Sequence, residues 1–552
     1  MGAKSERLTQ GDLPGSAEAV GRRTKEQRPM TRQKSERRIE PQARRKPGET
    51  HGNEHRGGGK ATPVNEQTGQ LGLALGTAEE RETKVKRADG EADMGQLMPA
   101  PHAEPKPRDK EKYATSATME EVCRRLERAF DNVARNQGAP GPDGQSIAEV
   151  RKQLPRLLPK LRAELLGGKY EPGNIRRVWI DKSSGGQRGL GIPNVMDRMV
   201  MEAVRQVLEP VYEPTFHEAS HGFRPGRSCH TAIALAREYV EQGYEWVVDL
   251  DLEKFFDGVN HQRLMARLSQ RISDRDLLVL IGRMLKAKVV MPDGVVVSTE
   301  EGVPQGGPLS PLLSNIVLDE LDQELGERGH RFVRYADDCN IYVRSERSGQ
   351  RVKESVVCFI NRRLRLKVNE AKSAVARPEE RHFLGFRLRR EPLTGEVEVL
   401  LSARSKERID SKIRELTPRT WGSTLKACIL GLNVYLIGWI GFFSICTPPA
   451  ETTFGTLDAH IRRRLRAIQV KQWKTKRTIA RRLVKLGAPR KLVWRTVYAG
   501  RKSWWGQSHT SAIHRGLRNA YFAERGLMSL AEQWKQRTQR IDAPVQLRLA
   551  LG

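Results

Sequence analysis

The sequence predicts an α+β domain followed by a basic, α-helical region. Between residues 150 and 390, short apolar strands alternate irregularly with segments of helical spacing, which favours a sheet covered by helices. From residue 401 onward the pattern is helical and the charge changes sharply. This part holds 30 Lys and Arg against 8 Asp and Glu, so it carries +22 of the chain's net charge of +30.

The composition indicates a nucleic-acid partner. Among 552 residues, 97 are Lys or Arg and 67 are Asp or Glu, and a protein this basic most often binds nucleic acid. The 6 cysteines form no CxxC pair, which argues against structural zinc and against a disulfide framework. The first residues, MGAKSERLTQ, contain no apolar core, so we expect no secretory signal, and the sparse, unpaired cysteines fit a reducing compartment such as the cytoplasm.

Residues 1–117 should form a disordered basic extension. They are rich in Arg, Lys, Glu, Gly and Gln and contain no aromatic residue before Tyr113. Such a segment buries too little apolar surface to offset its chain entropy. Its basic clusters, RRIEPQARRK and HRGGGK, would either contact RNA or form a solvated tail.

The folded elements are expected in the following order. A helix over 119–136 comes first, because Val122, Leu126, Phe130 and Val133 recur at helical spacing before the breaker GAPGPDG. Four further elements follow: a hairpin over 178–193 with a Gly-rich turn, a helix over 198–214 closed by Pro, a buried strand over 245–257 that runs into a turn, and a helix over 308–328.

The stretch RFVRYADDCNIYVRS, residues 331–345, predicts two short strands with Asp337 and Asp338 at the tip between them. Adjacent carboxylates repel, and strands disfavour Asp, so the presence of two aspartates at this tip requires a physical explanation. Upstream, Asp249 and Asp251 lie on the same face of the strand VVDLDL. Together the two strands would gather three carboxylates around hard divalent cations, as two-metal phosphoryl transfer requires. A solvated turn is the alternative.

Two later segments are expected to be helical. Residues 428–446 carry no charge and are long enough for a membrane span, but Asn433 and three glycines favour a buried core helix. Residues 461–482 hold 10 basic residues and no acidic one. Apolar residues line one face of this helix, which predicts docking on a core with a cationic outer surface. They are Leu457, Ile461, Leu465 and Ile468.

Several blocks in order resemble the reverse transcriptases that group II introns encode. NQGAPGPDG is similar to their N-terminal block, and GQRGLGIPNVMDRMVMEAV and HGFRPGRSCHTAI resemble their fingers. The palm is represented by DLDLEKFFD, EGVPQGGPLSPLLSNIVLDELD, YADD, LKVNEAKS and HFLGF. The maturase, or thumb, is represented by LNVYLIGWIGFF, LDAHIRRRLRAIQVKQWK and HRGLRNAYFAERGLMSL. The resemblance covers roughly residues 118–535.

This resemblance implies a right-hand polymerase, with fingers and palm over 118–395 and a helical thumb/maturase RNA-binding region over 396–552. It implies an RNA-directed DNA polymerase that binds its group II intron RNA, assists its splicing and copies it into DNA for retromobility. Target DNA, a primer and deoxynucleoside triphosphates would be its other partners, without a membrane. A retron-like or diversity-generating enzyme, or a splicing-only RNA chaperone, is the alternative.

The family often carries a C-terminal HNH endonuclease with paired cysteines. This sequence offers no CxxC after the maturase blocks, so we expect that domain to be absent. Cleavage of the second DNA strand would then come from another source, or the target would already be nicked or single-stranded. The sequence does not predict an oligomeric state.

The resemblance also assigns residues. Asp251, Asp337 and Asp338 would be catalytic and hold two Mg²⁺ ions, while Asp249 and Asp257 would be structural. The nucleotide-binding candidates are Lys182, Arg188, Phe256, Gln305 and Lys372. Among these, Phe256 would exclude a 2′-hydroxyl and Lys372 would donate a proton to the leaving pyrophosphate. The RNA-binding candidates are Arg462, Arg463, Arg464, Arg466, Lys471 and Lys474. Tryptophans in the basic region would stack on bases or pack; they are Trp473, Trp494, Trp504 and Trp505.

Overall fold

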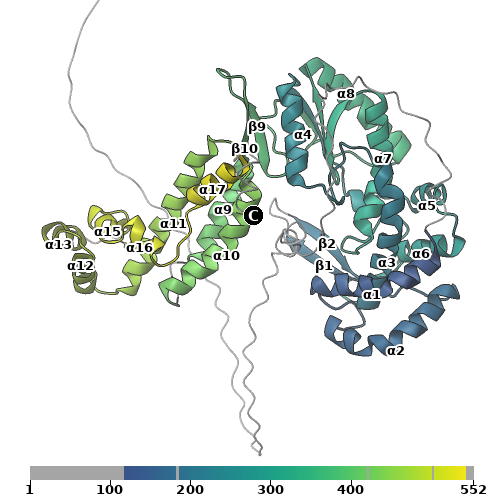
Figure 1. Ribbon diagram of the computed structural model, residues 1–552, viewed down its shortest axis with the longest axis horizontal. Helices are drawn as coiled ribbons and strands as arrows, with labels where there is room; N and C mark the ends of the chain where they lie inside the picture. Colours follow the sequence, from purple (N-terminus) through teal and green to yellow (C-terminus); the bar gives the residue numbers. More distant parts are fainter. Residues whose placement is uncertain (1–116, 182–185, 419, 421, 500–502, 543–552) are drawn as a thin grey trace, which may run out of the picture. The chain divides into compact units, whose positions relative to one another are not determined.

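The computed structural model describes residues 117–181, 186–418, 420, 422–499 and 503–542 (Figure 1). These residues fall within one compact unit, 86–552. The predicted N-terminal extension up to residue 116 and Lys182 lie outside the described residues, so both predictions stay open.

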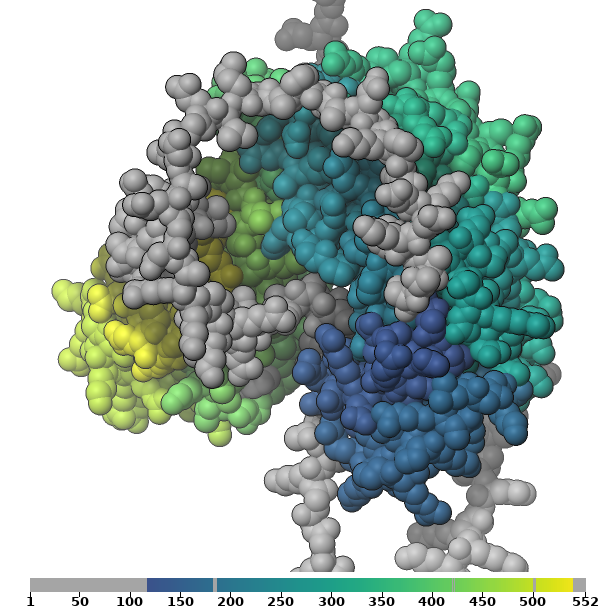
Figure 2. Space-filling view, turned by 45° about the vertical axis from the view of Figure 1, so that its right-hand side comes forward, coloured from purple at the N-terminus to yellow at the C-terminus, as the bar shows by residue number. Residues whose placement is uncertain are grey.

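Three helices form the first packed layer. They are α1 (Met119–Arg135), α2 (Ile147–Leu166) and α3 (Val195–Tyr212). Helix α1 confirms the first predicted helix and begins where Thr118 Oγ1 accepts a hydrogen bond from the backbone N–H of Glu121. Its buried face, which includes Leu126 and Phe130, packs against α3. In Figure 2, α1 and α2 form one continuous purple-to-blue surface.

A four-stranded sheet follows, with the order β2-β1-β4-β5. Its strands are β1 (Ile175–Asp181), β2 (Gln187–Ile192), β4 (Val289–Val290) and β5 (Val296–Val297). The antiparallel pair β1–β2 confirms the predicted hairpin. Between β2 and β4 the chain also forms α5 (His261–Ser269) and α6 (Arg275–Leu285), both of which bury apolar residues in the first core.

A second four-stranded sheet, ordered β6-β7-β3-β8, contains the acidic tip. Its strands are β3 (Trp246–Leu250), β6 (Arg331–Tyr335), β7 (Asp338–Val343) and β8 (Ala374–Ala376). All neighbours are antiparallel, and Tyr335 pairs with Asp338 at the turn between β6 and β7. Because Leu250 pairs with Cys339, the residue after β3 emerges at the same end of the sheet as this turn. The predicted hairpin and strand are confirmed.

The two faces of this sheet belong to two hydrophobic cores. Val248 and Ile341 point into the core that also holds residues of α7 (Ser310–Glu327) and α8 (Glu346–Phe359). Val247 and Tyr342, the alternate residues, point into a second core with α4 (Cys229–Glu241) and the C-terminal helices. The period of two along each strand therefore buries the sheet on both sides.

After residue 401 the described chain is helical, which confirms the predicted fold class. The strands β9 (Phe386–Arg390) and β10 (Val397–Leu401) form an antiparallel hairpin that spans the predicted domain boundary at 395/396. The longer helices are α9 (Ala403–Leu416), α10 (Leu425–Phe443), α11 (Ala450–Gln472), α12 (Lys476–Lys485), α13 (Arg490–Tyr498) and α17 (Leu530–Asp542), and the short ones are α14 (Trp504–Gln507), α15 (Ser511–Gly516) and α16 (Asn519–Ala523).

Helix α10 is buried on one face only. Leu432 and Leu436 are fully buried, whereas Leu430, Val434 and Ile437 on the opposite face are 67%, 71% and 53% exposed. The prediction of a buried core helix is therefore right for one face of α10 and wrong for the opposite face. Within the described residues, α10 alone is long and apolar enough to cross a membrane, a test that core helices of soluble proteins also pass.

The basic stretch 461–482 forms two helices, so the prediction of a single helix is wrong. Helix α11 ends at Gln472, Lys474 adopts a left-handed conformation with φ 59°, and Thr475 caps α12. The predicted apolar face is confirmed. Leu457, Ile461, Leu465 and Ile468 are all buried in the second core.

Candidate active site

Four aspartates lie at one end of the second sheet. Asp337 occupies the turn, Asp338 begins β7, Asp249 lies in β3 and Asp251 directly follows β3. Desolvation first, and then the charges of Asp337, Asp249 and Asp251, raise the pKa of Asp338 to about 7, although Asp338 is reached by solvent. Burial also raises the pKa of Asp337, while the charge of Arg188 opposes that rise. The carboxylates therefore form one electrostatic site.

Asp251 is fixed through its backbone. Its N–H donates to Ser373 Oγ at 3.0 Å, and its carbonyl oxygen accepts from the N–H of Asn369 at 2.8 Å. Its carboxylate stays partly exposed and meets the ammonium group of Lys372, with 3.2 Å between Nζ and Oδ2. The predicted catalytic aspartate and the predicted proton donor are thus direct neighbours.

Asp249 has a cationic partner of its own. Arg381 donates from Nε and Nη2 to Asp249 Oδ2 at 2.8 and 2.5 Å, and its Nη2 also donates to the Lys372 carbonyl oxygen at 2.7 Å. Arg381 therefore ties the segment that carries Lys372 to strand β3. This partner agrees with the structural role expected for Asp249, and the sequence reasoning missed Arg381.

A buried ion pair, which the sequence reasoning also missed, supports the acidic turn from within. Arg334 in β6 is fully buried and donates to both carboxylate oxygens of Asp322 in α7. The same guanidinium donates to Asn315 Oδ1, to Ser220 Oγ and to the carbonyl oxygen of Ala336. The available signal was a charged residue at an inward position of the strand RFVRY.

Ala336, the residue before Asp337, is strained. Its φ is 58°, a left-handed conformation that is uncommon for residues other than Gly. Gly222 presses against it so closely that a Cβ at that glycine would lie 2.3 Å from the Ala336 backbone nitrogen. The Gly222 carbonyl in turn accepts from Asn315 Nδ2 at 2.9 Å. The turn that presents Asp337 is therefore held by Gly222 and by the Arg334 guanidinium. Asn315 hydrogen-bonds both of these residues.

The VPQGG loop joins this region to the first sheet. Arg188 Nε in β2 donates to Gln305 Oε1 at 2.7 Å, and the N–H of Gly191 donates to the Gln305 carbonyl oxygen at 2.6 Å. Gly306 has a φ of 120°, and a Cβ there would meet the Gly191 carbonyl oxygen at 2.4 Å. Only glycine allows this approach. Two predicted nucleotide-binding residues, Arg188 and Gln305, are thus in contact.

Phe256 lies beside the same loop. It belongs to a short 3-10 helix, Phe255–Asp257, and its carbonyl oxygen accepts from the N–H of Val303 at 2.7 Å. Phe256 is 8% exposed, and its ring meets that of Phe255 edge-on at 5.3 Å between centroids. The residue therefore packs mainly as core, and only a small part of it is open to contact with a sugar.

The donor chemistry of the site suits a divalent cation, because carboxylate oxygens are its preferred ligands. Among the residues that the structure describes, however, no three His, Cys, Asp or Glu side chains converge as a group that would hold a metal ion. Lys372 supplies the positive charge beside Asp251 in this arrangement. The carboxylates fit the ion by type, and their side chains are not arranged around one point.

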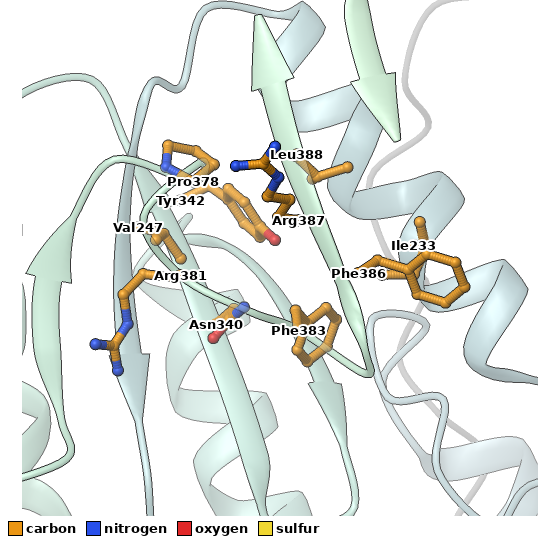
Figure 3. Close-up of a pocket in the computed structure, with 10 residues that line it drawn as sticks. All are labelled: Ile233, Val247, Asn340, Tyr342, Pro378, Arg381, Phe383, Phe386, Arg387 and Leu388. Atoms are coloured by element: carbon orange, nitrogen blue, oxygen red, sulfur yellow. The ribbon is translucent and has the colours of Figure 1, made fainter. Parts of the chain in front are cut away.

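A small hollow behind the site is too small for a nucleotide. It holds about 10 Å³, the space of a single water molecule, between the sheet and the β9 segment (Figure 3). Asn340, Tyr342 and Phe386 line it, and Asn340 Oδ1 is buried without a hydrogen-bond partner. We therefore expect a nucleotide to bind on the solvent-exposed side of the turn that carries Asp337 and Asp338, and not in this hollow.

The predicted RNA-binding residues separate into two groups. Lys471 and Lys474 are exposed, and Arg462 and Arg463 are half-buried, with the Arg463 guanidinium 4.1 Å from the centroid of the Trp505 ring. Arg464 and Arg466 are instead buried.

The buried pair is hydrogen-bonded inside the protein. Arg464 donates to the Thr417 hydroxyl and carbonyl oxygens, and Arg466 donates to the Leu517 carbonyl oxygen. Because α11 is covered on both sides, Arg464 and Arg466 are not free for phosphates, and we withdraw them as RNA-binding candidates.

Comparison with known proteins matches both regions. A family model described as reverse transcriptase (RNA-dependent DNA polymerase) matches residues 180–388, and one described as group II intron, maturase-specific domain matches residues 406–486. The chain is 34% identical to Protein YkfC of Escherichia coli (strain K12), over 53% of this chain and 86% of that protein. It is 30% identical to the group II intron-encoded protein LtrA of Lactococcus lactis, over 52% of this chain and 61% of LtrA. The chain belongs to the group II intron-encoded reverse transcriptase/maturases.

Two further matches cover a smaller share of this chain. A putative COX1/OXI3 intron 2 protein of Saccharomyces cerevisiae is 39% identical over 30% of this chain and 20% of that protein. A chain of a solved Cas6-RT-Cas1–Cas2 complex is 24% identical over 44% of this chain and 42% of that chain, with a TM-score of 0.30, a likeness too low to carry an argument.

The reverse transcriptase/maturase is an RNA-directed DNA polymerase with a region of the kind that serves intron splicing. Reverse transcriptases generally depend on divalent metal ions, and proteins of this family bind intron RNA and use DNA and deoxynucleotide substrates. The relatives include the intron-encoded LtrA of a bacterium and a nuclear intron maturase of Arabidopsis thaliana that is named as mitochondrial.

Proposed function

We propose that Asp251, Asp337 and Asp338 hold two Mg²⁺ ions and that the protein uses them to copy its own intron RNA into DNA. When bound, the ions would activate the primer 3′-oxygen and neutralise the leaving pyrophosphate. The observation that supports the proposal is the antiparallel register of the second sheet, which brings Asp251, directly after β3, to the same end as the turn with Asp337 and Asp338.

The surrounding residues would then bind and orient the nucleotide. Arg188, which already lies near Asp337 and holds Gln305, would contact the triphosphate from the fingers side. Lys372 would leave Asp251 when cations neutralise that carboxylate, and its ammonium would be free to donate a proton to pyrophosphate. Phe256 would abut the sugar and exclude a 2′-hydroxyl. Lys182 stays a candidate from the sequence alone.

The basic C-terminal region would bind the intron RNA and assist its folding for splicing. Lys471, Lys474, Arg462 and Arg463 remain its predicted phosphate contacts, and their binding should weaken with salt as counterions are released. Fingers and palm over 118–395 and thumb/maturase over 396–552 remain the proposed domains. We place this activity in the bacterial cytoplasm, with target DNA, a primer and deoxynucleoside triphosphates as its further partners.

The experiment is extension of a DNA primer on an RNA template by the full chain, with and without Mg²⁺, beside splicing of the intron RNA. Asp337→Asn and Asp338→Asn should each abolish extension and leave RNA affinity close to that of the wild type. Asp131→Asn, an exposed change on α1, is the control. Undiminished extension by the two variants would refute the assignment, and splicing without any wild-type extension would favour an RNA chaperone.

A further inference from the structure

Helices α12 and α13 form a hairpin whose outer surface is cationic and aromatic. The two helices pack side by side, as Figure 1 also shows. Between residues 474 and 498 the sequence contains no acidic residue. The exposed cations of this segment are Lys474, Arg477, Arg481, Arg482, Lys485, Arg490, Lys491 and Arg495. The hairpin thus cannot neutralise its own charge, and it offers a complement to a polyanion.

Two aromatic rings lie on this cationic surface. Trp494 and Tyr498 are one helical turn apart on α13, and their rings stack with 5.1 Å between centroids and 12° between planes. They are 37% and 43% exposed. Lys476 at the start of α12 places its Nζ 5.8 Å from the centroid of the Tyr498 ring, so the stack is held from the neighbouring helix as well.

The other tryptophans of the basic region do not share this placement. Trp473 is 5% exposed and belongs to the second core. Trp504 packs against the same core, and Trp505 is half-buried beneath Arg463. Among the described aromatic residues of this region, Trp494 and Tyr498 are thus the ones that combine exposure, parallel stacking and surrounding cations.

We propose that the Trp494–Tyr498 stack is a platform for an unpaired RNA base, with the cations of α12 and α13 holding the flanking phosphates. A flat exposed ring gains from stacking with any base, whereas duplex ends and grooves offer few free base faces. RNA is the favoured ligand because α12 lies inside the match to the maturase-specific model and because folded RNA exposes bases in loops and bulges.

This inference rests on the proposed RNA-binding function and narrows it to one surface. It assigns base stacking to Trp494 and Tyr498 and phosphate contact to residues such as Arg481. The two roles differ in their dependence on salt, because stacking releases no counterions and phosphate contact does. That difference makes them separable by experiment.

The test uses the full chain and a short fluorescent oligo(A) RNA, with an RNA hairpin duplex, a DNA duplex and oligo(dA) of the same length as comparisons. Trp494→Ala should weaken oligo(A) binding about fivefold or more, with an unchanged salt slope. Trp494→Phe should recover most of that loss. Arg481→Gln should lower the salt slope by about 0.7 and keep the preference for unpaired RNA. Leu393→Ala, which removes a 93% exposed apolar side chain elsewhere, should have no effect.

Two further measurements keep the outcome decisive. Ultraviolet cross-linking of a 4-thiouridine RNA should map to the peptide that contains Trp494 and Tyr498, which separates this surface from other basic surfaces of the chain. Thermal unfolding is recorded for each variant, and Trp494→Leu, which retains apolar contact with Tyr498, replaces the alanine variant if that one is unstable.

Wild-type affinity in Trp494→Ala, cross-links confined to other peptides, or selective loss of duplex DNA binding would each overturn the proposal. Equal losses with oligo(A) and oligo(dA) would overturn the choice of RNA. Primer extension on a preformed RNA–DNA substrate is measured separately with wild-type protein. Its absence would refute the polymerase assignment without bearing on the oligonucleotide result.

Discussion

Arg334 and Asp322 form a bidentate ion pair in which neither residue reaches solvent, with hydrogen bonds of 2.7 and 2.5 Å. The pair joins β6 to α7, and the remaining donors of Arg334 reach Ser220, Asn315 and the carbonyl oxygen of Ala336. Because Ala336 carries the left-handed φ of 58° directly before Asp337, the pair supports the turn that presents this proposed catalytic residue without touching it.

This relationship predicts separate effects on stability and activity. Arg334→Ala would leave a buried carboxylate unpaired and should cost about 3–5 kcal/mol of unfolding free energy. The double variant Arg334→Met/Asp322→Leu removes both charges, so urea unfolding should show most of the stability restored. Primer extension should remain low in the double variant, because nothing then holds the Ala336 carbonyl. Wild-type extension by that variant would show that the pair serves stability alone.

Phe256 should control sugar discrimination, while its neighbour should not. Phe256→Val opens space beside the VPQGG loop, so the preference for deoxy over ribo substrates should fall about tenfold or more. Phe255→Val, which shortens a ring that is 3% exposed, is the matched control. Paired competition between dNTP and rNTP on one primer–template measures both. If discrimination stays the same in the Phe256 variant, the residue is core.

The two faces of α10 should respond oppositely to charge. Leu432→Asp places a carboxylate in the second core and should unfold the C-terminal helices, since an unpaired buried charge costs several kcal/mol. Val434→Asp adds the same charge on the exposed face and should change stability by less than about 0.5 kcal/mol. Thermal unfolding without detergent gives the comparison. Recovery of the wild type only from membranes, resistant to high salt, would contradict the docked-helix arrangement.

Substitutions of buried and exposed basic residues in the C-terminal region should have different effects. A buried arginine should affect stability, and an exposed lysine should affect RNA binding. Burial lowers the pKa of Arg466 to about 10, and its guanidinium satisfies the Leu517 carbonyl. Arg466→Gln should therefore cost about 1–3 kcal/mol and leave the salt slope of RNA binding unchanged. Lys471→Gln and Lys474→Gln should each lower that slope by about 0.7 to 0.9 and keep the melting temperature. Salt titrations of intron binding decide between them, and a reversed pattern would mean that Arg466 reaches RNA.

The sequence was sufficient for the acidic turn but not for its support. Alternation in RFVRYADDCNIYVRS specifies two strands, and their antiparallel register with β3 brings Asp251 to the same edge. The partner of Arg334 lies on another helix, and no local pattern identifies it. Arg381 likewise reaches Asp249 only through the fold.

The basic region shows a different limit of sequence reasoning. Helical spacing identified the buried face with Leu457 and Ile461, but α11 is covered from two sides, by the segment after α9 and by the segment after α15. An amphipathic sequence pattern predicts one buried helix face. The burial of Arg464 and Arg466 on other faces of α11 therefore could not be predicted from that pattern. The break before α12 depends on the left-handed conformation of Lys474. No Gly or Pro stands at this position, so the sequence did not predict the break.

Strand β8 is the last strand of the second sheet to be synthesised. Ser373 and Asn369, which hold the backbone of Asp251, are translated after Asp337 and Asp338, and β8 then covers the free edge of β3. One face of the same sheet belongs to a core that contains α4 and also C-terminal helices that leave the ribosome later still. A nascent chain therefore leaves this core incomplete until the C-terminal helices have been made.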